Sequence, residues 1–176
     1  MEADRSTPEA AVGHLFAVHG EQLLRMAVLL TGDRQVAEEL VQEAFAHLWQ
    51  RWPSLHDQAA SLGYLRVTLV NLARSSFRRR ALELRHRVVP AATVEQPDMA
   101  VRVDVLRALA RLPMRKRACL VLRFYADLSE METARLLGVS VGTVKSQTHR
   151  GLARLGQLLK DSGEAPTAAA PSKGRR

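Results

Sequence analysis

The sequence predicts an all-α protein, built as two small helical domains joined by a flexible linker. Apolar residues recur at three- and four-residue steps, whereas the alternation typical of strands is nearly absent. Aromatic residues make up only 5% of the chain, so its cores must consist mainly of Leu, Val and Ala, which suit helices. A stretch with two prolines and no period lies at residues 84–100 and separates the two helical halves.

The N-terminal half is expected to hold three helices, at about residues 9–30, 34–51 and 62–79. Gly32 should end the first helix in the left-handed conformation, and Asp33 should cap the second. The second helix has the clearest period of the three. Its apolar positions, at four-residue steps, are Val36, Leu40, Ala44, Leu48 and Trp52.

The C-terminal half is expected to hold a helix at about 101–112, a second helix at 113–125, and then a helix-turn-helix. Ser129 and Glu132 have the spacing of a capping box, Gly138 can end that helix, and Ser140 can cap the next one. Two helices joined by so short a glycine-containing turn form a helix-turn-helix. The inward side chains expected on its first helix are Met131, Ala134 and Leu137.

The second helix of this pair has two different faces. Its apolar side should carry Val141, Val144, Thr148, Leu152, Leu155 and Leu159. Its outward side should carry Gly142, Ser146, His149, Arg150 and Ala153, with Thr143 and Lys145 beside them. Small residues permit close approach to a groove, and the polar ones can donate to bases or phosphates. The pattern predicts a DNA-reading helix; the alternative is a solvated face.

Charge is unevenly distributed along a chain whose net charge is +8 and whose pI is about 10.7. Residues 32–50 hold four acidic side chains and one arginine, whereas residues 74–87 hold six arginines and one glutamate. Residues 145–160 hold four basic side chains and no acidic one. A basic balance favours nucleic acid as a partner, and the acidic segment indicates a partner of another kind.

Two surface stripes are expected in the N-terminal half. Glu39, Gln42 and Glu43 lie on one face of the second helix, where plain solvation is the alternative to partner binding. The third helix aligns Asn71 and Arg74 with Arg78. An amide can pair with a base edge and arginines can contact phosphates, which suits nucleic acid. Tyr64 could stack on an unpaired base or belong to the core.

Other classes of protein are disfavoured. The lone Cys119 excludes an internal disulfide and a CxxC zinc site, and is expected to be a small buried hydrophobe. No apolar stretch is long enough to span a membrane and the polar N-terminus is unlike a signal peptide, which predicts a cytoplasmic protein. The acidic and histidine residues lack ligand spacing, so no enzyme, metal or cofactor is expected. The cluster "MRKR" at 114–117 should contact phosphate or be solvated.

Three linked stretches resemble the extracytoplasmic-function (ECF) sigma factors, the smallest sigma-70-like bacterial transcription initiation factors. They are "LTGDRQVAEELVQEAFAHLWQRW", "YLRVTLVNLARSSFRRR" and "LPMRKRACLVLRFYADLSEMETARLLGVSVGTVKSQTHRGLARL". The resemblance covers residues 9–159, and the three stretches occur in the family's order. Within the family, the sequence is similar to the sigma-E-type subgroup common in actinobacteria. The resemblance implies a region 2-like domain at 9–83, a linker at 84–100, a region 4-like domain at 101–160 and a disordered tail at 161–176.

The resemblance also implies partners and roles. Glu39, Gln42 and Glu43 would bind the clamp of the largest subunit of bacterial core RNA polymerase. The −10 promoter element would be read as a single strand by Tyr64, Arg66, Asn71, Arg74 and Arg78. The −35 duplex would be read by Thr143, Lys145, Ser146, His149 and Arg150. An anti-sigma factor is a further partner that the resemblance implies.

Two positions depart from the family, and one other function competes. Gln147 stands where an arginine is usual, and Gly151 stands where an alanine is usual and should soften the helix by up to about 1 kcal/mol. A stand-alone helix-turn-helix regulator would explain the C-terminal half. It would not explain an arginine-rich helix with Asn71 in the other domain.

Overall fold

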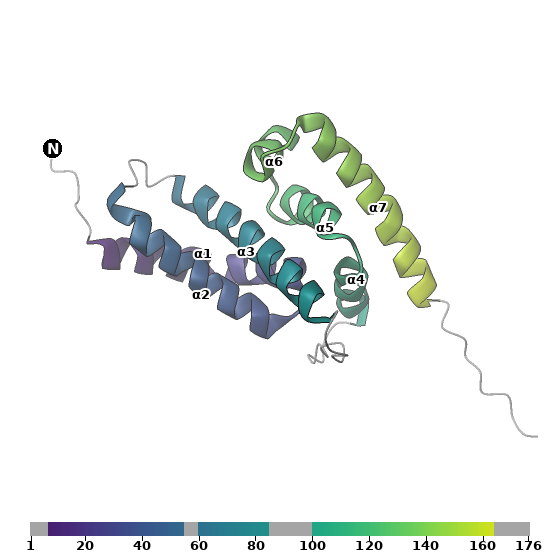
Figure 1. Ribbon diagram of the computed structural model, residues 1–176, viewed down its shortest axis with the longest axis horizontal. Coiled ribbons are helices and arrows are strands. Elements are labelled where there is room, and N and C mark those ends of the chain that lie inside the picture. The colour runs from purple at the N-terminus through teal and green to yellow at the C-terminus, as the bar shows by residue number, and fades with distance from the viewer. Residues whose placement is uncertain (1–6, 55–59, 85–99, 164–176) are drawn as a thin grey trace, which may run out of the picture.

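The computed structural model describes residues 7–54, 60–84 and 100–163, and every regular element in these ranges is a helix. The all-α prediction is therefore confirmed (Figure 1). The elements are α1 (Pro8–Thr31), α2 (Arg34–Arg51), η1 (Trp52–Ser54), α3 (Ser61–Leu84), α4 (Ala100–Ala110), α5 (Met114–Leu120), η3 (Val121–Tyr125), α6 (Glu130–Leu137) and α7 (Val141–Gly163). Most of the expected linker and of the expected tail lies outside the described residues.

The turn between α1 and α2 forms as the sequence predicts. Gly32 has φ +75°, and its N–H donates to the carbonyl of Val28 at 2.8 Å. The Asp33 carboxylate accepts from the N–H of Val36 at 3.1 Å and so caps α2. Because both ends are closed by local bonds, α1 and α2 leave the turn as an antiparallel pair (Figure 1).

The N-terminal domain packs α1, α2 and α3 around one apolar core. Its fully buried side chains include Leu23, Leu30, Leu48, Leu65 and Leu69. Helix α3 continues to Leu84, beyond the expected end near Arg79. The sequence "RALEL" that follows Arg79 consists of good helix formers and contains no breaker.

The helix expected at 113–125 changes type in its second half. After α5, the backbone of η3 widens to a π-turn, in which Ala126 N–H donates to the carbonyl of Val121 at 3.0 Å. Leu128 N–H then donates to Leu122 at 3.1 Å, and Asp127 has φ +51°. This closing turn directs the chain into α6.

The helix-turn-helix is formed by α6 and α7. Ser129 and Glu132 make both bonds of the predicted capping box, and Gly138 ends α6 with φ +64°. The Ser140 hydroxyl accepts from the N–H of Thr143 at 3.1 Å and caps α7.

Three residues of the helix-turn-helix were placed on the wrong face by their periodicity. Val141, the first residue of α7, is 37% exposed instead of lying on the apolar side. Met131 is 64% exposed, because α6 turns Thr133 and Ala134 toward the core instead. Leu152 is 46% exposed, because the buried stripe of α7 is centred on Val144. Leu152 therefore lies beside that stripe instead of within it.

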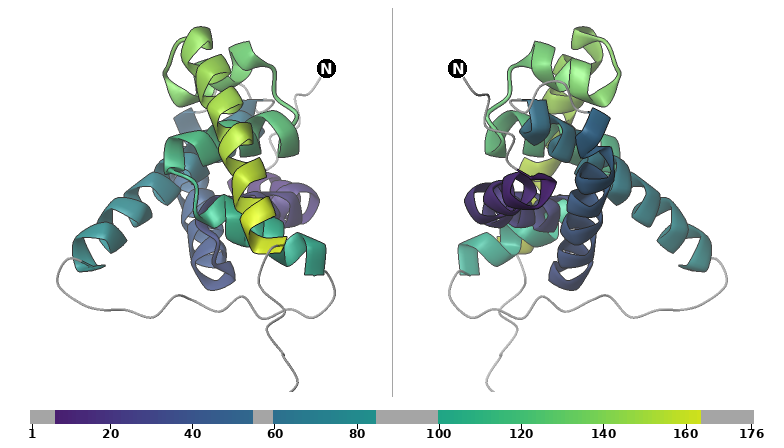
Figure 2. Two further views of the ribbon diagram at one scale, coloured as in Figure 1. Left: turned by 90° about the vertical axis from the view of Figure 1, so that its right-hand side faces the viewer. Right: turned by 90° about the vertical axis from the view of Figure 1, so that its left-hand side faces the viewer.

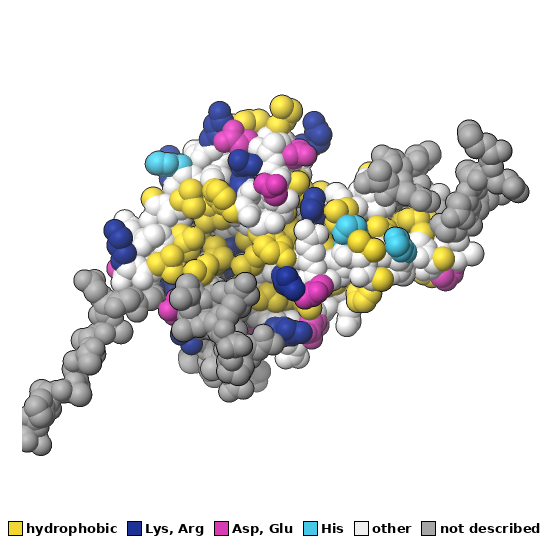
Figure 3. Space-filling view, turned by 180° about the vertical axis from the view of Figure 1, so that it is seen from behind, with side chains coloured by type: hydrophobic (Ala, Val, Ile, Leu, Met, Phe, Trp, Pro, Cys, Tyr) yellow, Lys and Arg dark blue, Asp and Glu magenta, His cyan; other side chains and the backbone are white. Residues whose placement is uncertain are grey.

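The two domains pack against each other. Helix α5 lies between α3 and α7, and α4 lies against the C-terminal part of α1 (Figures 1 and 2). Ala118, Val121 and Leu122 belong to the same buried cluster as the core of the N-terminal domain. Hydrophobic side chains accordingly gather across the middle of the molecule when it is seen from behind (Figure 3). We refer to this arrangement as the closed form.

Candidate nucleic-acid and polymerase interfaces

The outward face of α7 presents the residues expected there. Thr143, Lys145, His149 and Arg150 are exposed, and Ser146 is half-buried. The Ser146 hydroxyl donates to the carbonyl of Thr143 at 3.0 Å, and the hydroxyls of Ser140 and Thr143 lie 2.9 Å apart. These bonds fix the first turn of the helix, so that its side chains leave from a rigid backbone.

Two cations of this face differ in their surroundings. Lys145 Nζ lies 3.6 Å from a carboxylate oxygen of Glu130 on α6. Arg150 has no carboxylate within ion-pair distance among the described residues. The arginine is thus available to an anionic partner, whereas the lysine must first leave Glu130.

Gly151 sets how closely α7 approaches α5. A Cβ at this position would lie 3.2 Å from Cγ of Leu120 and 3.3 Å from one of its methyl groups. The missing side chain lets the two helices pack at close range, which explains why a glycine is present where the sequence alone indicated only a weakened helix.

On α3 the expected −10 residues fall into two groups. Asn71 and Arg78 are exposed on one side, with Tyr64 and Arg74 half-buried beside them. Arg66 is five residues from Asn71, so it points to another side of the helix. Burial lowers the pKa of Arg66, and the nearby carboxylate of Glu132 raises it. The structure therefore places Arg66 toward α6 and away from the other members of its set.

Tyr64 already has a cation over its ring. The guanidinium carbon of Arg51 lies 5.9 Å from the ring centroid. Arg51 ends α2 and was not among the expected site residues, since its distance in sequence from Tyr64 gave no sign of the contact. The face on which an unpaired base would stack is thus covered by a replaceable cation.

The polar stripe on α2 that was expected to bind a partner is exposed to solvent. Glu39, Gln42 and Glu43 are all exposed. Trp49 is 42% exposed and follows Gln42 by two helical turns, so it lies on the same face. A large aromatic side chain next to a polar stripe is typical of a protein-binding surface.

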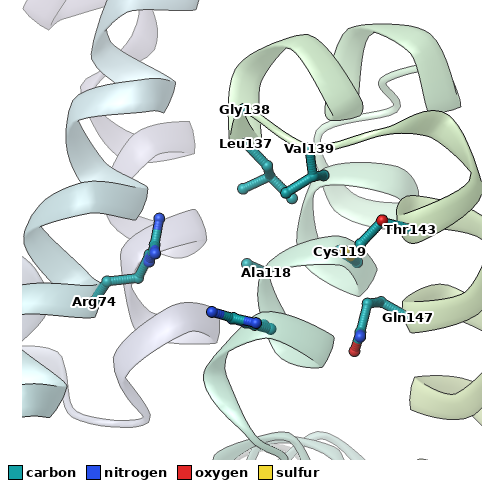
Figure 4. Close-up of a pocket in the computed structure, with 9 residues that line it drawn as sticks. Arg74, Ala118, Cys119, Leu137, Gly138, Val139, Thr143 and Gln147 are labelled. Atoms are coloured by element: carbon teal, nitrogen blue, oxygen red, sulfur yellow. The ribbon is translucent and has the colours of Figure 1, made fainter.

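One pocket of about 400 Å³ lies between the two domains. Arg74 faces it from α3, and Thr143 and Gln147 face it from α7 (Figure 4). Arg115 of α5 adds a second guanidinium, and no acidic residue lines the pocket. Cys119 also lines it, and burial raises the pKa of its thiol. Residues from both expected DNA sites thus share one pocket.

Comparison with known proteins identifies the family. The profile "Sigma-70 region 2" matches residues 15–83, and the profile "Sigma-70, region 4" matches residues 102–155. RNA polymerase sigma-E factor from Streptomyces coelicolor is 38% identical over 145 residues, which cover 79% of this chain and 80% of the relative. ECF RNA polymerase sigma factor SigM from Mycobacterium tuberculosis is 33% identical over 154 residues, which cover 85% and 77%.

Solved structures give the same result. The sigma factor RpoE from Bartonella quintana, solved in complex with the anti-sigma factor NepR, is 25% identical and has a TM-score of 0.74. The match covers 84% of this chain and 96% of that one. CnrH, solved with the cytosolic domain of CnrY, has a TM-score of 0.63.

These matches define a bacterial transcription initiation factor of the sigma-70 type. The chain belongs to the ECF RNA polymerase sigma factors. It is an alternative initiation factor, and the competing interpretation as a stand-alone helix-turn-helix regulator is set aside. In the part of the chain that the structure describes, no helix has both the length and the apolar character that crossing a bilayer requires.

Proposed function

We propose that this sigma factor directs core RNA polymerase to promoters by reading the −10 element as a single strand with α3 and the −35 duplex with α7. The observation that carries the proposal is the outward face of α7. Behind a capped turn, this face presents Lys145, His149 and Arg150 on a helix whose opposite side is buried. A helix of this kind enters a major groove with its first turns against the base edges.

In the −35 complex, Arg150 is the main candidate for a base or phosphate contact, because no carboxylate competes for it among the described residues. Lys145 would exchange its bond with Glu130 for a phosphate. Thr143, Ser146 and His149 supply further donors around the first turns. The pattern predicts binding that depends strongly on salt.

In the −10 complex, the exposed amide of Asn71 can pair with the edge of a flipped base, while Arg74 and Arg78 follow the backbone. Tyr64 can offer its ring once the guanidinium of Arg51 moves aside. Arg66 takes part only if α6 leaves it, since Glu132 lies near it in the closed form.

Core polymerase would bind the stripe of Glu39, Gln42 and Glu43, with Trp49 as its apolar anchor. The expected contact on polymerase is the clamp of the largest subunit. The cytoplasm is the compartment where such a factor meets polymerase and DNA. We propose no enzymatic activity and no metal or cofactor.

An anti-sigma factor is the further partner we propose, because the similar sigma factor RpoE from Bartonella quintana was solved in complex with the anti-sigma factor NepR. The test is co-purification of the tagged chain from its native host under several growth conditions. Recovery of polymerase alone under every condition would contradict this part of the proposal.

The decisive experiment is transcription in vitro with sigma-free core polymerase and a library of upstream genomic fragments. Discrete start sites should appear only with this protein. Arg150→Ala and Asn71→Ala should each lower initiation about 5- to 150-fold, the effect of losing a contact worth about 1–3 kcal/mol. Arg107→Ala is the matched control, since Arg107 is exposed on α4 and, among the residues that the structure describes, its ion pair is with Asp104. Unchanged initiation in both test variants would refute the assigned roles.

A further inference from the structure

Arg117 is a completely buried cation that is held by backbone carbonyls. Its exposed fraction is 0%. Nη1 donates to the carbonyl of Leu30 at 2.6 Å, and Nη2 donates to the carbonyl of Leu112 at 2.9 Å and to that of Ala110. The guanidinium carbon also lies 4.6 Å from the centroid of the Phe77 ring. The sequence predicted that the "MRKR" cluster is solvated or contacts phosphate, which is wrong for Arg117.

Two other guanidiniums, those of Arg74 on α3 and Arg115 on α5, have no such partners. Both line the pocket of about 400 Å³ that lies between the two domains. Among the residues that the structure describes, neither side chain has a hydrogen-bond or ion-pair partner, and no acidic residue lines the pocket. Like charges that face one cavity repel each other, and an anion between them removes that repulsion. The pocket is therefore suited to a negatively charged ligand.

Polar groups without charge face the pocket from α7. Thr143 and Gln147 lie on the side away from Arg74 (Figure 4). The hydroxyl of Thr143 lies 2.9 Å from that of Ser140, whereas the amide of Gln147 has no hydrogen-bond partner in the described part of the chain. The amide nitrogen can donate to an oxyanion. An anion in the pocket would thus find donors from both domains.

Apolar side chains form the rest of the lining. Leu137 and Val139 come from the end of α6 and the turn after it, and Ala118 and Cys119 come from α5. The volume of about 400 Å³ lies within the range of roughly 300–1,000 Å³ that small-molecule sites occupy. A bare phosphate ion would fill only a small part of it and would leave the apolar lining in contact with water. The pocket therefore suits an anion that carries an apolar body.

We propose that this pocket binds a small organic phosphate, whose phosphate group pairs with Arg74 and Arg115 and whose apolar body lies against Leu137 and Val139. A phosphomonoester carries about two negative charges at neutral pH, so it neutralises both cations, whereas a carboxylate neutralises one. The planar guanidinium also fits two phosphate oxygens at once. The site belongs to the free chain, and it does not depend on how α3 and α7 meet promoter DNA.

The first test is calorimetric titration of the full chain, without polymerase or DNA, with naphthyl phosphate as the probe. Its fused rings are apolar and its phosphate is a dianion. We expect a single saturable site on each chain, with an affinity at least about tenfold higher than that for inorganic phosphate or for naphthol, which each supply only one part of the probe. Absence of saturable binding of naphthyl phosphate at about 1 mM would overturn the proposal.

Naphthalene sulfonate tests the requirement for a dianion. It has the same rings and a single negative charge at neutral pH, so it neutralises only one of the two guanidiniums. We expect it to bind at least about fivefold more weakly than naphthyl phosphate. Equal affinities for the two compounds would show that the pocket accepts aromatic anions of any kind, and this result would refute the assignment to phosphate.

Arg115→Gln tests the phosphate end of the site. It should weaken binding of naphthyl phosphate about tenfold or more, because it removes charge-assisted hydrogen bonds to the phosphate. Arg111→Gln is the matched control, since Arg111 is an exposed arginine of the same domain and is not part of the pocket lining. Circular dichroism checks that both variants keep their helices. Equal affinities of the two variants would mean that only the net positive charge of the chain attracts the ligand, which contradicts the site.

Amide NMR spectra locate the ligand. Naphthyl phosphate should shift the amide resonances of Ala118, Gly138 and Gln147, which line the pocket, and should leave that of Gly13 on α1 unchanged. Shifts confined to other surfaces would place the ligand elsewhere and would overturn the proposal. Because every measurement uses the chain alone, its result does not depend on whether the protein initiates transcription.

Discussion

Lys145 on the recognition helix and Glu130 at the start of the preceding helix form an ion pair of 3.6 Å across the helix-turn-helix. Both side chains are partly exposed, so the pair itself contributes little to stability. We expect its main effect to be on DNA binding, because the carboxylate neutralises a cation that we propose contacts phosphate.

We predict that Glu130→Gln strengthens binding of the polymerase complex to promoter duplex by about two- to fivefold at low salt, as expected for an exposed pair worth up to about 1 kcal/mol. Fluorescence anisotropy across a salt series measures this. Glu21→Gln, which releases Arg25 on α1, is the control and should leave affinity unchanged. Weaker binding by Glu130→Gln would mean that the carboxylate positions Lys145 for DNA.

Two glycines of α7 should respond in opposite ways to alanine. At Gly151 the new Cβ would press against buried Leu120 at 3.2 Å, and overpacking of about 1–3 kcal/mol exceeds the gain in helix propensity of about 1 kcal/mol. At Gly156 nothing lies within 4 Å. Gly151→Ala should therefore lower the free energy of unfolding and Gly156→Ala should raise it by about 0.5–1 kcal/mol. Urea unfolding compares them, and two stabilising changes would contradict the close packing of α5 and α7.

The capping box of α6 predicts a dependence of stability on pH. The carboxylate of Glu132 accepts from the N–H of Ser129 at 2.7 Å, and hydrogen bonding with Ser129 lowers the pKa of Glu132 below its ordinary value of 4.5. The stabilisation is thus present above pH 4.5 and is lost as the pH falls through the lowered pKa.

We expect the thermal midpoint of the wild type to fall more steeply on acidification below about pH 4.5 than that of Glu132→Gln, which has no titrating carboxylate at this position. At neutral pH Ser129→Ala should cost about 1 kcal/mol, the usual loss of an N-cap. Calorimetry at several pH values measures both effects, with exposed Ser75→Ala as the control. Parallel pH profiles for the wild type and Glu132→Gln would exclude Glu132 as the group responsible.

Trp49 should contribute strongly to polymerase binding. Its side chain is 42% exposed on the face of Gln42, and aromatic anchors of protein interfaces often contribute about 2 kcal/mol or more, which corresponds to about thirtyfold or greater in affinity. Trp49→Ala should weaken binding to core polymerase by this amount, whereas Val18→Ala on α1 should not. A pull-down with titrated core enzyme measures it. Equal affinities would place the polymerase contact on another face.

Local bonds explain which features of the fold could be predicted from sequence. Gly32 with Asp33, and Ser129 with Glu132, act within one turn of chain, so residue types at fixed spacing were sufficient. The exposure of Met131 could not be predicted in this way, because it depends on which side of α6 meets its neighbours.

For the candidate sites too, features that depend on one helix could be predicted from the sequence, and contacts between distant segments could not. The exposed faces of α2 and α7 agree with helical periodicity, which determines which side chains share a face. The cation of Arg51 over Tyr64, the close approach at Gly151 and the burial of Arg117 arise from contacts between distant segments. No spacing within one helix encodes such contacts. The roles at the promoter and on polymerase remain predictions.

The side chain of Arg117 both contacts the N-terminal domain and holds a turn of its own domain, so a substitution there would affect both. The guanidinium donates to the carbonyl of Leu30 in α1, which belongs to the other domain. It also donates to the carbonyls of Ala110 and Leu112, which lie in the turn from α4 into α5. A substitution that released the domains would therefore loosen the DNA-reading domain in the same step. A substitution meant to change only the contact between the domains is therefore better placed in α1 or α3 than at Arg117.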